Sequence, residues 1–134
     1  MVVDTGVLVS AFAFGGIPEK ALRKVFVEAE IYVSPPLLEE YREVPLALES
    51  QGKIDHVQVK SLLSGIASFV AAAKVVHPHN NITICRDPGD NMLIECSLAA
   101  KAEVLITSDK DLLALEDLPF DLAILTPRGF LEGK

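Results

Sequence analysis

Short apolar segments alternate along this chain of 134 residues with longer stretches in which apolar residues recur at helical spacing. The apolar segments predict strands at residues 2–3, 31–33, 74–76, 104–106 and 122–125. The stretches between them predict helices near residues 18–29, 35–44, 55–73 and 89–101, and a short one through 112–113. Buried strands joined through helices form parallel sheets. The sequence therefore predicts an α/β fold, a three-layer sandwich with a mainly parallel central sheet flanked by helices, as one domain over residues 1–134.

Acidic residues stand where the predicted strands end. Asp4 ends the first strand, Asp109 follows the strand at 104–106, and Asp90 lies in the first turn of the helix between them. Ligand sites of open parallel sheets gather beyond the carboxyl ends of the strands, so these three carboxylates are expected to meet. Carboxylates gathered without bases repel, and a hard divalent cation such as Mg²⁺ or Mn²⁺ usually resolves that repulsion. Phosphodiester hydrolysis is the matching reaction class.

Helix capping is the alternative explanation for several of these acids. Asp87 with Asp90, and Ser108 with Asp111, each have the spacing of a capping box. Asp4 does not fit this explanation, because Thr5 and Gly6 are expected to turn the chain rather than to open a helix. A buried carboxylate at that position needs a partner.

Two prolines bear on the predicted helix after the second strand. Ser34 followed by Pro35 is a typical helix start, and Pro45 is expected to disturb the helix that follows. Glu39 and Glu40 both lie on this helix. Neighbouring helical residues point about 100° apart, so only one of the two glutamates can face a shared site.

Four acidic blocks occur in order along the chain, and together they resemble the PIN-domain family. The blocks are VVDTGVLVSA at 2–11, LLEEYREV at 37–44, RDPGDNML at 86–93 and LITSDKDLL at 105–113, with a closing ILTPRGFL at 124–131. The resemblance covers essentially the whole chain. It implies a metal-dependent nuclease that is similar in fold and metal chemistry to the FLAP nucleases.

The resemblance also implies which residues form the site. The family's acidic quartet, both catalytic and metal-binding, falls on Asp4, Glu40, Asp90 and Asp109. Glu40 is preferred to Glu39 because it stands three residues ahead of Glu43. Accessory acids are expected at Asp87 and Asp111.

A free-standing PIN domain of this size resembles the VapC-like toxins of bacterial and archaeal toxin–antitoxin systems. The resemblance therefore implies a Mg²⁺- or Mn²⁺-dependent endoribonuclease that cleaves single-stranded RNA, with an antitoxin protein as a partner and a homodimeric assembly. Arg42, Arg86 and Lys110 adjoin the proposed site segments and are candidate RNA-binding residues. The alternative is that these bases are solvated and balance neighbouring acids, since no run of bases exceeds two.

One position departs from the family pattern. The first block usually reads Asp-Thr-Asn, whereas this chain has Gly6 after Asp4 and Thr5. Loss of that amide supports an alternative function, a degenerate PIN scaffold that binds RNA or protein without cutting. The same triplet is also similar to that of aspartic proteases, but those are all-β proteins and the stretch from 55 to 73 is helical by its periodicity.

Composition limits the remaining classes. A net charge of −7 and a pI near 4.9 argue against broad nonspecific adhesion to nucleic acid, which requires clustered bases. The sequence shows neither a membrane-spanning apolar run nor a signal peptide, so a cytoplasmic protein is expected. Cys85 and Cys96 are expected to be ordinary thiols, and His77 and His79 to be exposed loop residues rather than metal ligands.

Overall fold

The computed structural model describes residues 1–79, 83, 85, 87–116, 118 and 120–133. Its strands pair in parallel throughout, in two groups with the orders β1-β4-β5 and β2-β3. A bond of 2.9 Å from the Tyr32 backbone N–H to the Met1 carbonyl joins the two groups between β2 and β1. The strands are β1 (Val2–Val3), β2 (Ile31–Val33), β3 (Ala73–Val75), β4 (Val104–Ile106) and β5 (Ala123–Leu125). The predicted parallel sheet flanked by helices is confirmed.

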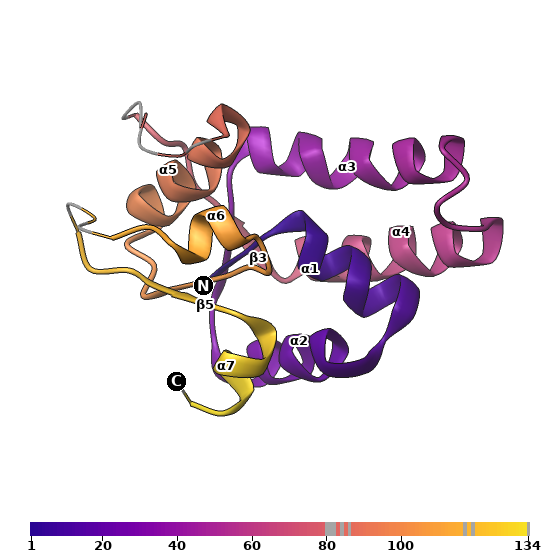
Figure 1. Cartoon of the computed structure of the whole chain (residues 1–134), viewed down its shortest axis with the longest axis horizontal. Helices are drawn as coiled ribbons and strands as arrows, with labels where there is room; N and C mark the ends of the chain where they lie inside the picture. Colours follow the sequence, from indigo (N-terminus) through magenta and orange to yellow (C-terminus); the bar gives the residue numbers. More distant parts are fainter. Residues whose placement is uncertain (80–82, 84, 86, 117, 119, 134) are drawn as a thin grey trace.

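Helices connect the strands and pack around them (Figure 1). Figure 1 shows α3 and α4 extending side by side away from the strands, with α5 on the opposite side and α7 below the strands in this view. The helices are α1 (Thr5–Val9), α2 (Gly16–Glu28), α3 (Pro35–Ser50), α4 (His56–Ala71), α5 (Asn91–Ala100), α6 (Lys110–Leu113) and α7 (Pro127–Leu131), with a π-helical turn η1 (Ser10–Phe14) and a 3₁₀ turn η2 (Pro88–Asp90). In the described part of the chain, no helix is long and apolar enough to span a bilayer.

The apolar residues that predicted the strands form the centre of the core. Val2, Val3, Leu105 and Ile106 are fully buried. The helices contribute the larger buried side chains, among them Tyr41 of α3, whose ring packs edge-on against Phe69 of α4 with centroids 6.1 Å apart. The two long helices are therefore anchored in the same core as the strands.

The strand register brings three chain segments to one edge. Val3, the last residue of β1, lies opposite Ile106, the last residue of β4, and Ile106 lies opposite Leu125, the last residue of β5. The residues that follow these strand ends, Asp4 and Thr107 among them, are therefore neighbours although about a hundred positions separate them.

Two expectations about local structure were wrong. Helix α3 continues through Pro45 to Ser50, with Pro45 buried inside it. Packing of α3 on α4 outweighs the hydrogen bond that a proline removes from a helix. Thr5 begins helix α1 directly after β1, so Asp4 occupies an N-cap position after all. Its side chain is bonded chiefly by the Thr107 hydroxyl, with the N–H groups of Gly6 and Thr5 contributing.

Candidate active site

The hydroxyl of Thr107 connects two of the proposed site acids. It donates to Asp4 Oδ2 at 2.6 Å and accepts from the backbone N–H of Asp109 at 3.1 Å. Thr107 is fully buried, and its own N–H donates to the Leu125 carbonyl at 2.9 Å. The Asp4 carboxylate and the start of the Asp109 segment are therefore held by one buried side chain that β4 and β5 fix in place.

Helix α3 brings the third acid to this edge. The buried hydroxyl of Thr5 donates to Glu40 Oε2 at 2.6 Å, so Glu40 lies beside the residue that follows Asp4. The next residue of α3, Tyr41, donates its hydroxyl to the Val3 carbonyl inside the core. Glu39 is exposed. Of the two adjacent glutamates, Glu40 is thus the one that reaches the strand ends.

Asp90 and Asp109 interact directly with one another. Their carboxyl groups share a hydrogen bond, which requires a proton on one of them. Partial burial, this bond and the charges of Asp109, Asp87 and Asp4 together raise the pKa of Asp90 to about 7, with burial the largest cause. The pair therefore holds a proton in the neutral range unless a cation replaces it.

The pKa values of the other two acids, Asp4 and Glu40, are raised as well. Burial raises the pKa of Asp4, and the charge of Asp109 adds to this, while the bond from Thr107 opposes it. Burial also raises the pKa of Glu40, with contributions from the charges of Asp4 and Asp87. Within the described residues, no Lys, Arg or His forms an ion pair with Asp4, Glu40, Asp90 or Asp109. Among the described residues, these four acids are thus a concentration of negative charge with no basic side chain paired to them.

The accessory acids take local backbone bonds. Asp87 Oδ1 accepts from the Gly89 N–H at 3.0 Å, so part of its expected capping role is present. The reciprocal half is absent, since Asp90 is directed to Asp109 instead. The other expected capping box was wrong: Asp109 is the N-cap of α6, and its Oδ1 accepts from the Asp111 N–H at 2.9 Å. Ser108 is exposed and caps no helix.

The donor set suits a hard divalent cation, because every proposed ligand is a carboxylate oxygen. The shared proton between Asp90 and Asp109 indicates that the ionised cluster is costly in the absence of a cation. In the part of the chain that the structure describes, however, no three His, Cys, Asp or Glu side chains are arranged to hold one metal ion. The acids lie at one edge of the sheet, but no three of them are arranged around a single metal position.

Gly6 lies on α1 with ordinary helical backbone. It is exposed, its φ is not positive, and a Cβ added there would meet no atom within 4 Å. The backbone therefore does not require glycine at this position, and the family's usual asparagine would fit.

Two of the candidate RNA-binding residues are exposed on helices of the described chain. Arg42 is exposed on α3 and Lys110 is exposed at the start of α6. Arg86 lies outside the described residues.

Sequence reasoning missed the bond from Thr5 to Glu40. A hydroxyl next to a buried acid at a strand end was the signal that could have predicted it.

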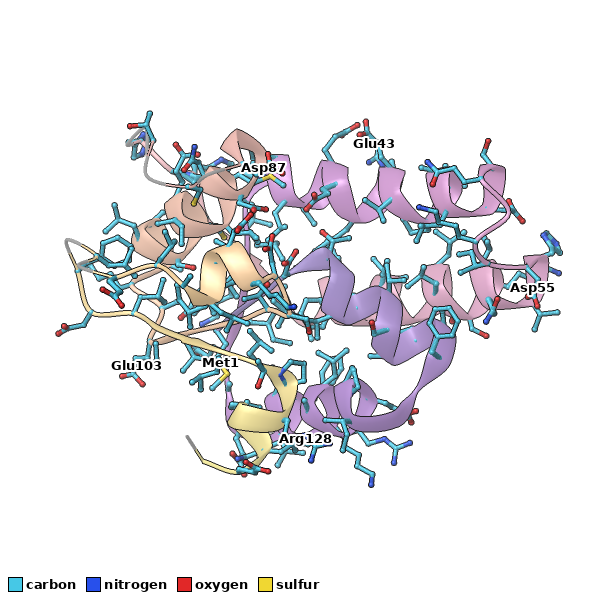
Figure 2. All side chains as sticks on the ribbon, in the orientation of Figure 1. Met1, Glu43, Asp55, Asp87, Glu103 and Arg128 are labelled. Carbon is cyan, nitrogen blue, oxygen red and sulfur yellow. The ribbon has the colours of Figure 1, made fainter. Side chains whose placement is uncertain are left out.

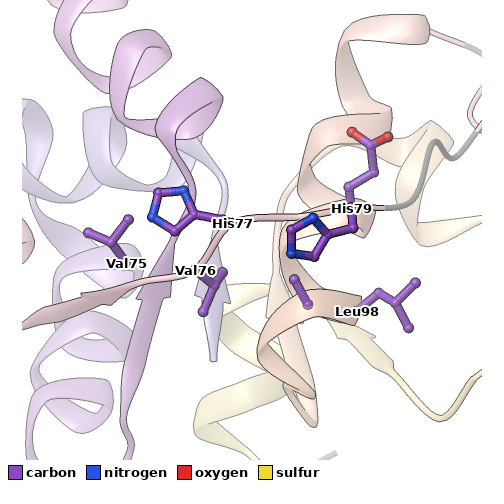
Figure 3. A pocket seen from close by; sticks show the side chains of 7 residues that line it. Val75, Val76, His77, His79 and Leu98 are labelled. Atoms are coloured by element: carbon purple, nitrogen blue, oxygen red, sulfur yellow. The ribbon is translucent and has the colours of Figure 1, made fainter.

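The sequence also singles out two histidines and two cysteines. His77 and His79 are exposed and line a cavity of about 480 Å³ with Glu95 and residues of β3 and α5 (Figure 3). Figure 3 shows their rings at separate places along the segment after β3. Cys85 and Cys96 are free thiols. Burial raises the pKa of each to about 11, so neither is a thiolate at neutral pH.

The chain is similar to known proteins in sequence and in fold. Residues 1–111 match the family model of the PIN domain. The uncharacterized protein MJ1680 of Methanocaldococcus jannaschii is 31% identical over 141 residues, which cover 98% of this chain and 89% of that protein. The solved structure of VapBC2 from Rickettsia felis, bound to a DNA fragment from its promoter, contains a chain that matches with a TM-score of 0.59 at 13% identity. The match covers 93% of this chain and 96% of that one.

Proposed function

Because this chain belongs to the PIN-domain family, whose members are generally nucleases, we propose that it is a metal-dependent endoribonuclease that hydrolyses phosphodiester bonds of single-stranded RNA. Its catalytic and metal-binding residues are Asp4, Glu40, Asp90 and Asp109, with Asp87 and Asp111 as accessory acids.

One observation carries this proposal. Four acids from four separate parts of the chain meet at the carboxyl edge of a parallel sheet, and each interacts electrostatically with at least one of the others. Two buried threonine hydroxyls orient members of the group, Thr107 toward Asp4 and Thr5 toward Glu40. A group that served only to cap helices would need neither the unpaired charge nor this support.

Mg²⁺ or Mn²⁺ is the cation that these carboxylates would hold. The chemistry that such a bound ion supplies is activation of a water nucleophile and stabilisation of charge on the leaving oxygen of the phosphodiester. The contribution of the chain itself is positioning. Thr107 fixes the rotamer of Asp4 and the backbone of Asp109, and Thr5 fixes Glu40. The carboxyl pair of Asp90 and Asp109 is the group at this edge that can hold or release a proton near neutral pH.

A toxin of a toxin–antitoxin pair is the biological role that we infer. The support is the fold shared with a chain of VapBC2 over nearly the whole of both chains. The proposal includes an antitoxin protein as partner, a homodimeric assembly of single-domain chains and action in the cytoplasm. Arg42, Arg86 and Lys110 are proposed as RNA contacts.

A degenerate scaffold that binds RNA or protein without cutting is the second candidate. Two observations favour it: Gly6 replaces the asparagine usual in the family, and no three described acids close around one point. The cleavage test below separates the two candidates.

The test is cleavage of single-stranded RNA by purified protein with Mg²⁺ or Mn²⁺. We expect cleavage that chelation abolishes and that Asp4→Asn or Asp90→Asn eliminates, because asparagine keeps the shape but removes the charge. Glu39→Gln is the matched control, since Glu39 is an exposed acid next to Glu40. Cleavage that survives chelation or both asparagine substitutions would contradict the proposal, and RNA binding without any cleavage would favour the scaffold.

A further inference from the structure

A cavity opens next to the acidic edge, on the side of β5 and α7. Its volume is about 340 Å³, which is within the range of roughly 300–1,000 Å³ typical of ligand sites. Three separate parts of the chain line it: the start of α2, the loop after β4 and the start of α7. The lining residues are Ile17, Pro18, Ser108, Thr126, Pro127 and Arg128.

The cavity is lined by residues next in the chain to those that hold the proposed site acids. Ser108 stands between Thr107, which holds Asp4, and Asp109. Thr126 follows Leu125, the residue whose carbonyl accepts from the Thr107 N–H. One wall of the cavity is therefore built from the same strand ends that carry the site acids.

The charge of the cavity is opposite to that of the edge beside it. Among the described residues that line it, one is a cation, Arg128, and none is a carboxylate. Arg128 is exposed on α7 (Figure 2), and it forms no ion pair with a carboxylate of the described residues. In a protein of net charge −7, an unpaired guanidinium beside a group of acids favours an anionic ligand at this position.

The remaining lining residues provide hydroxyls and an apolar surface. Ser108 is exposed and can donate or accept. Thr126 Oγ1 accepts from the Gly129 N–H at 2.9 Å, which leaves its proton available to a ligand. Ile17 and Pro18, at the start of α2, are half-buried and present carbon surface to the cavity. A phosphate with an attached sugar and base has the matching groups: an anion, polar oxygens and a flat apolar face.

We propose that this cavity is a nucleotide subsite, in which Arg128 binds a backbone phosphate of the RNA strand whose scissile bond lies at the acidic edge. This inference rests on the proposed ribonuclease function. The acidic edge repels the phosphates that flank the scissile one. The guanidinium of Arg128, in the neighbouring cavity, would hold the strand in place through a bidentate, charge-assisted contact with one of them. Arg128 is thus a substrate-positioning residue, and Ile17 and Pro18 pack against the base or ribose.

The test compares two substitutions that each remove one positive charge, Arg128→Gln and Lys53→Gln. Lys53 is exposed in the connection between α3 and α4, at the far end of the molecule, where Figure 2 labels Asp55. Binding of a fluorescent single-stranded oligoribonucleotide is measured by anisotropy in EDTA, where no cleavage occurs. We expect Arg128→Gln to bind about five- to tenfold more weakly than wild type and Lys53→Gln to bind as wild type does.

Salt dependence and kinetics sharpen this test. Loss of one phosphate contact should reduce the slope of log K against log salt by about 0.7 in Arg128→Gln, whereas Arg128→Lys should restore the slope but only part of the affinity. With Mg²⁺, Arg128→Gln should raise KM and leave kcat within about twofold of wild type. Both variants should melt as wild type does, because both side chains are exposed.

The possible outcomes separate the subsite from the nuclease. Wild-type cleavage with equal binding by Arg128→Gln and Lys53→Gln would overturn the subsite and leave the ribonuclease standing. Binding that depends on Arg128 without any cleavage would support the subsite and contradict the ribonuclease. Absence of RNA binding by the wild type would overturn the subsite.

Discussion

Acids at the two ends of the parallel strands have opposite surroundings. Where the strands begin, Glu30 accepts bonds from the Tyr32 hydroxyl and from Lys74 Nζ, the latter at 2.9 Å, and these bonds lower its pKa, with that from Tyr32 the larger cause. Where the strands end, burial raises the pKa of both Asp4 and Glu40, and no base among the described residues pairs with either.

The contrast separates a structural use of acids from a functional one. Glu30 is exposed and paired, the ordinary condition of a surface carboxylate. The acids at the other end repel one another and lower the stability of the folded chain when all are ionised. Figure 2 labels Asp87 toward this end, and Met1 and Glu103 toward the opposite one. An edge that costs stability in this way is expected where a ligand offsets the cost.

The largest expected effect is that of replacing Glu40, with its neighbour Glu39 on α3 as the comparison. Glu40→Gln should reduce kcat/KM for RNA cleavage by about 1,000-fold, because metal-ion catalysis contributes several kcal/mol. Glu39→Gln should change it by less than about twofold, since that side chain is exposed. Steady-state kinetics on one RNA substrate measure both, and equal losses in the two variants would remove Glu40 from the site.

The threonine that joins two acids should give the next largest effect. Thr107→Val keeps the size of the side chain but removes the bonds to Asp4 and to the Asp109 N–H. We expect activity to fall about 10- to 100-fold, as when outer-shell partners of metal ligands are removed. The measurement is kcat/KM together with metal affinity, and a variant with normal metal affinity and normal rate would show that the acids need no such support.

Mg²⁺ should stabilise the folded protein through the acids at the carboxyl ends of the strands, and not through Glu30 at the other end. At ten times its dissociation constant, Mg²⁺ adds RT ln 11, about 1.4 kcal/mol, or roughly 4 to 8 °C in Tm for a domain of this size. Asp4→Asn and Asp90→Asn should melt at or above wild type in EDTA and gain less from the metal. Glu30→Gln should keep the full gain. Thermal melts in EDTA and in Mg²⁺ decide this, and equal gains in all four proteins would mean that the acids form no cation site.

Lowering the pH should also raise Tm, but by less than Mg²⁺ does. The folded pKa of Asp90, about 7, lies above its unfolded value, so the folded state binds more protons and stability falls as pH rises from about 4 to 7. After discounting for the partial exposure of the group, we expect Tm in EDTA to rise by about 4 °C between pH 7 and pH 5.

Two substitutions serve as controls for this pH effect. Asp90→Asn should remove most of the rise, because the titrating group is gone. The contribution of Glu30 is present above its unfolded pKa, 4.5, and is lost only as pH falls from there through its lowered folded pKa, so Glu30→Gln should leave the rise unchanged. A Tm that falls in wild type between pH 7 and pH 5 would contradict the raised pKa of the acidic edge.

Restoring the family's usual residue beside Asp4 should have the smallest effect. Gly6→Asn has room for its side chain and needs no unusual backbone, so it should fold normally and raise activity about two- to fivefold if the missing amide weakens the site. Cleavage rates of the two proteins at saturating metal test this. An unchanged rate would mean that the amide contributes nothing in this chain, because strain at position 6 is not available as an explanation.

The sequence predicted the parts of the fold that depend on apolar periodicity. The strands around Val3 and Ile106 and the helix from His56 to Ala71 follow from buried runs and from helical spacing, which short-range patterns record well. Continuation of α3 through Pro45 was not predictable in this way, because packing of the whole helix on α4 decides it.

Acids at strand ends were predictable, but their partners were not. The positions of Asp4 and Asp109 follow from where the strands stop, whereas the bond between Asp4 and Thr107 depends on the register of β1 with β4. Ser108 was the expected cap of the next helix. The geometry of the turn selects Asp109.

The bond from the Tyr41 hydroxyl to the Val3 carbonyl ties α3 to the end of β1 inside the core. Glu40 precedes Tyr41 and Asp4 follows Val3, so the backbones that carry the two acids can separate only if the core itself opens. Buried strands open with free energies that approach that of global unfolding, and their amides are the slowest to exchange with deuterium. Local melting is therefore too costly to switch off this pair, and control of the proposed nuclease falls to molecules that cover the edge from outside.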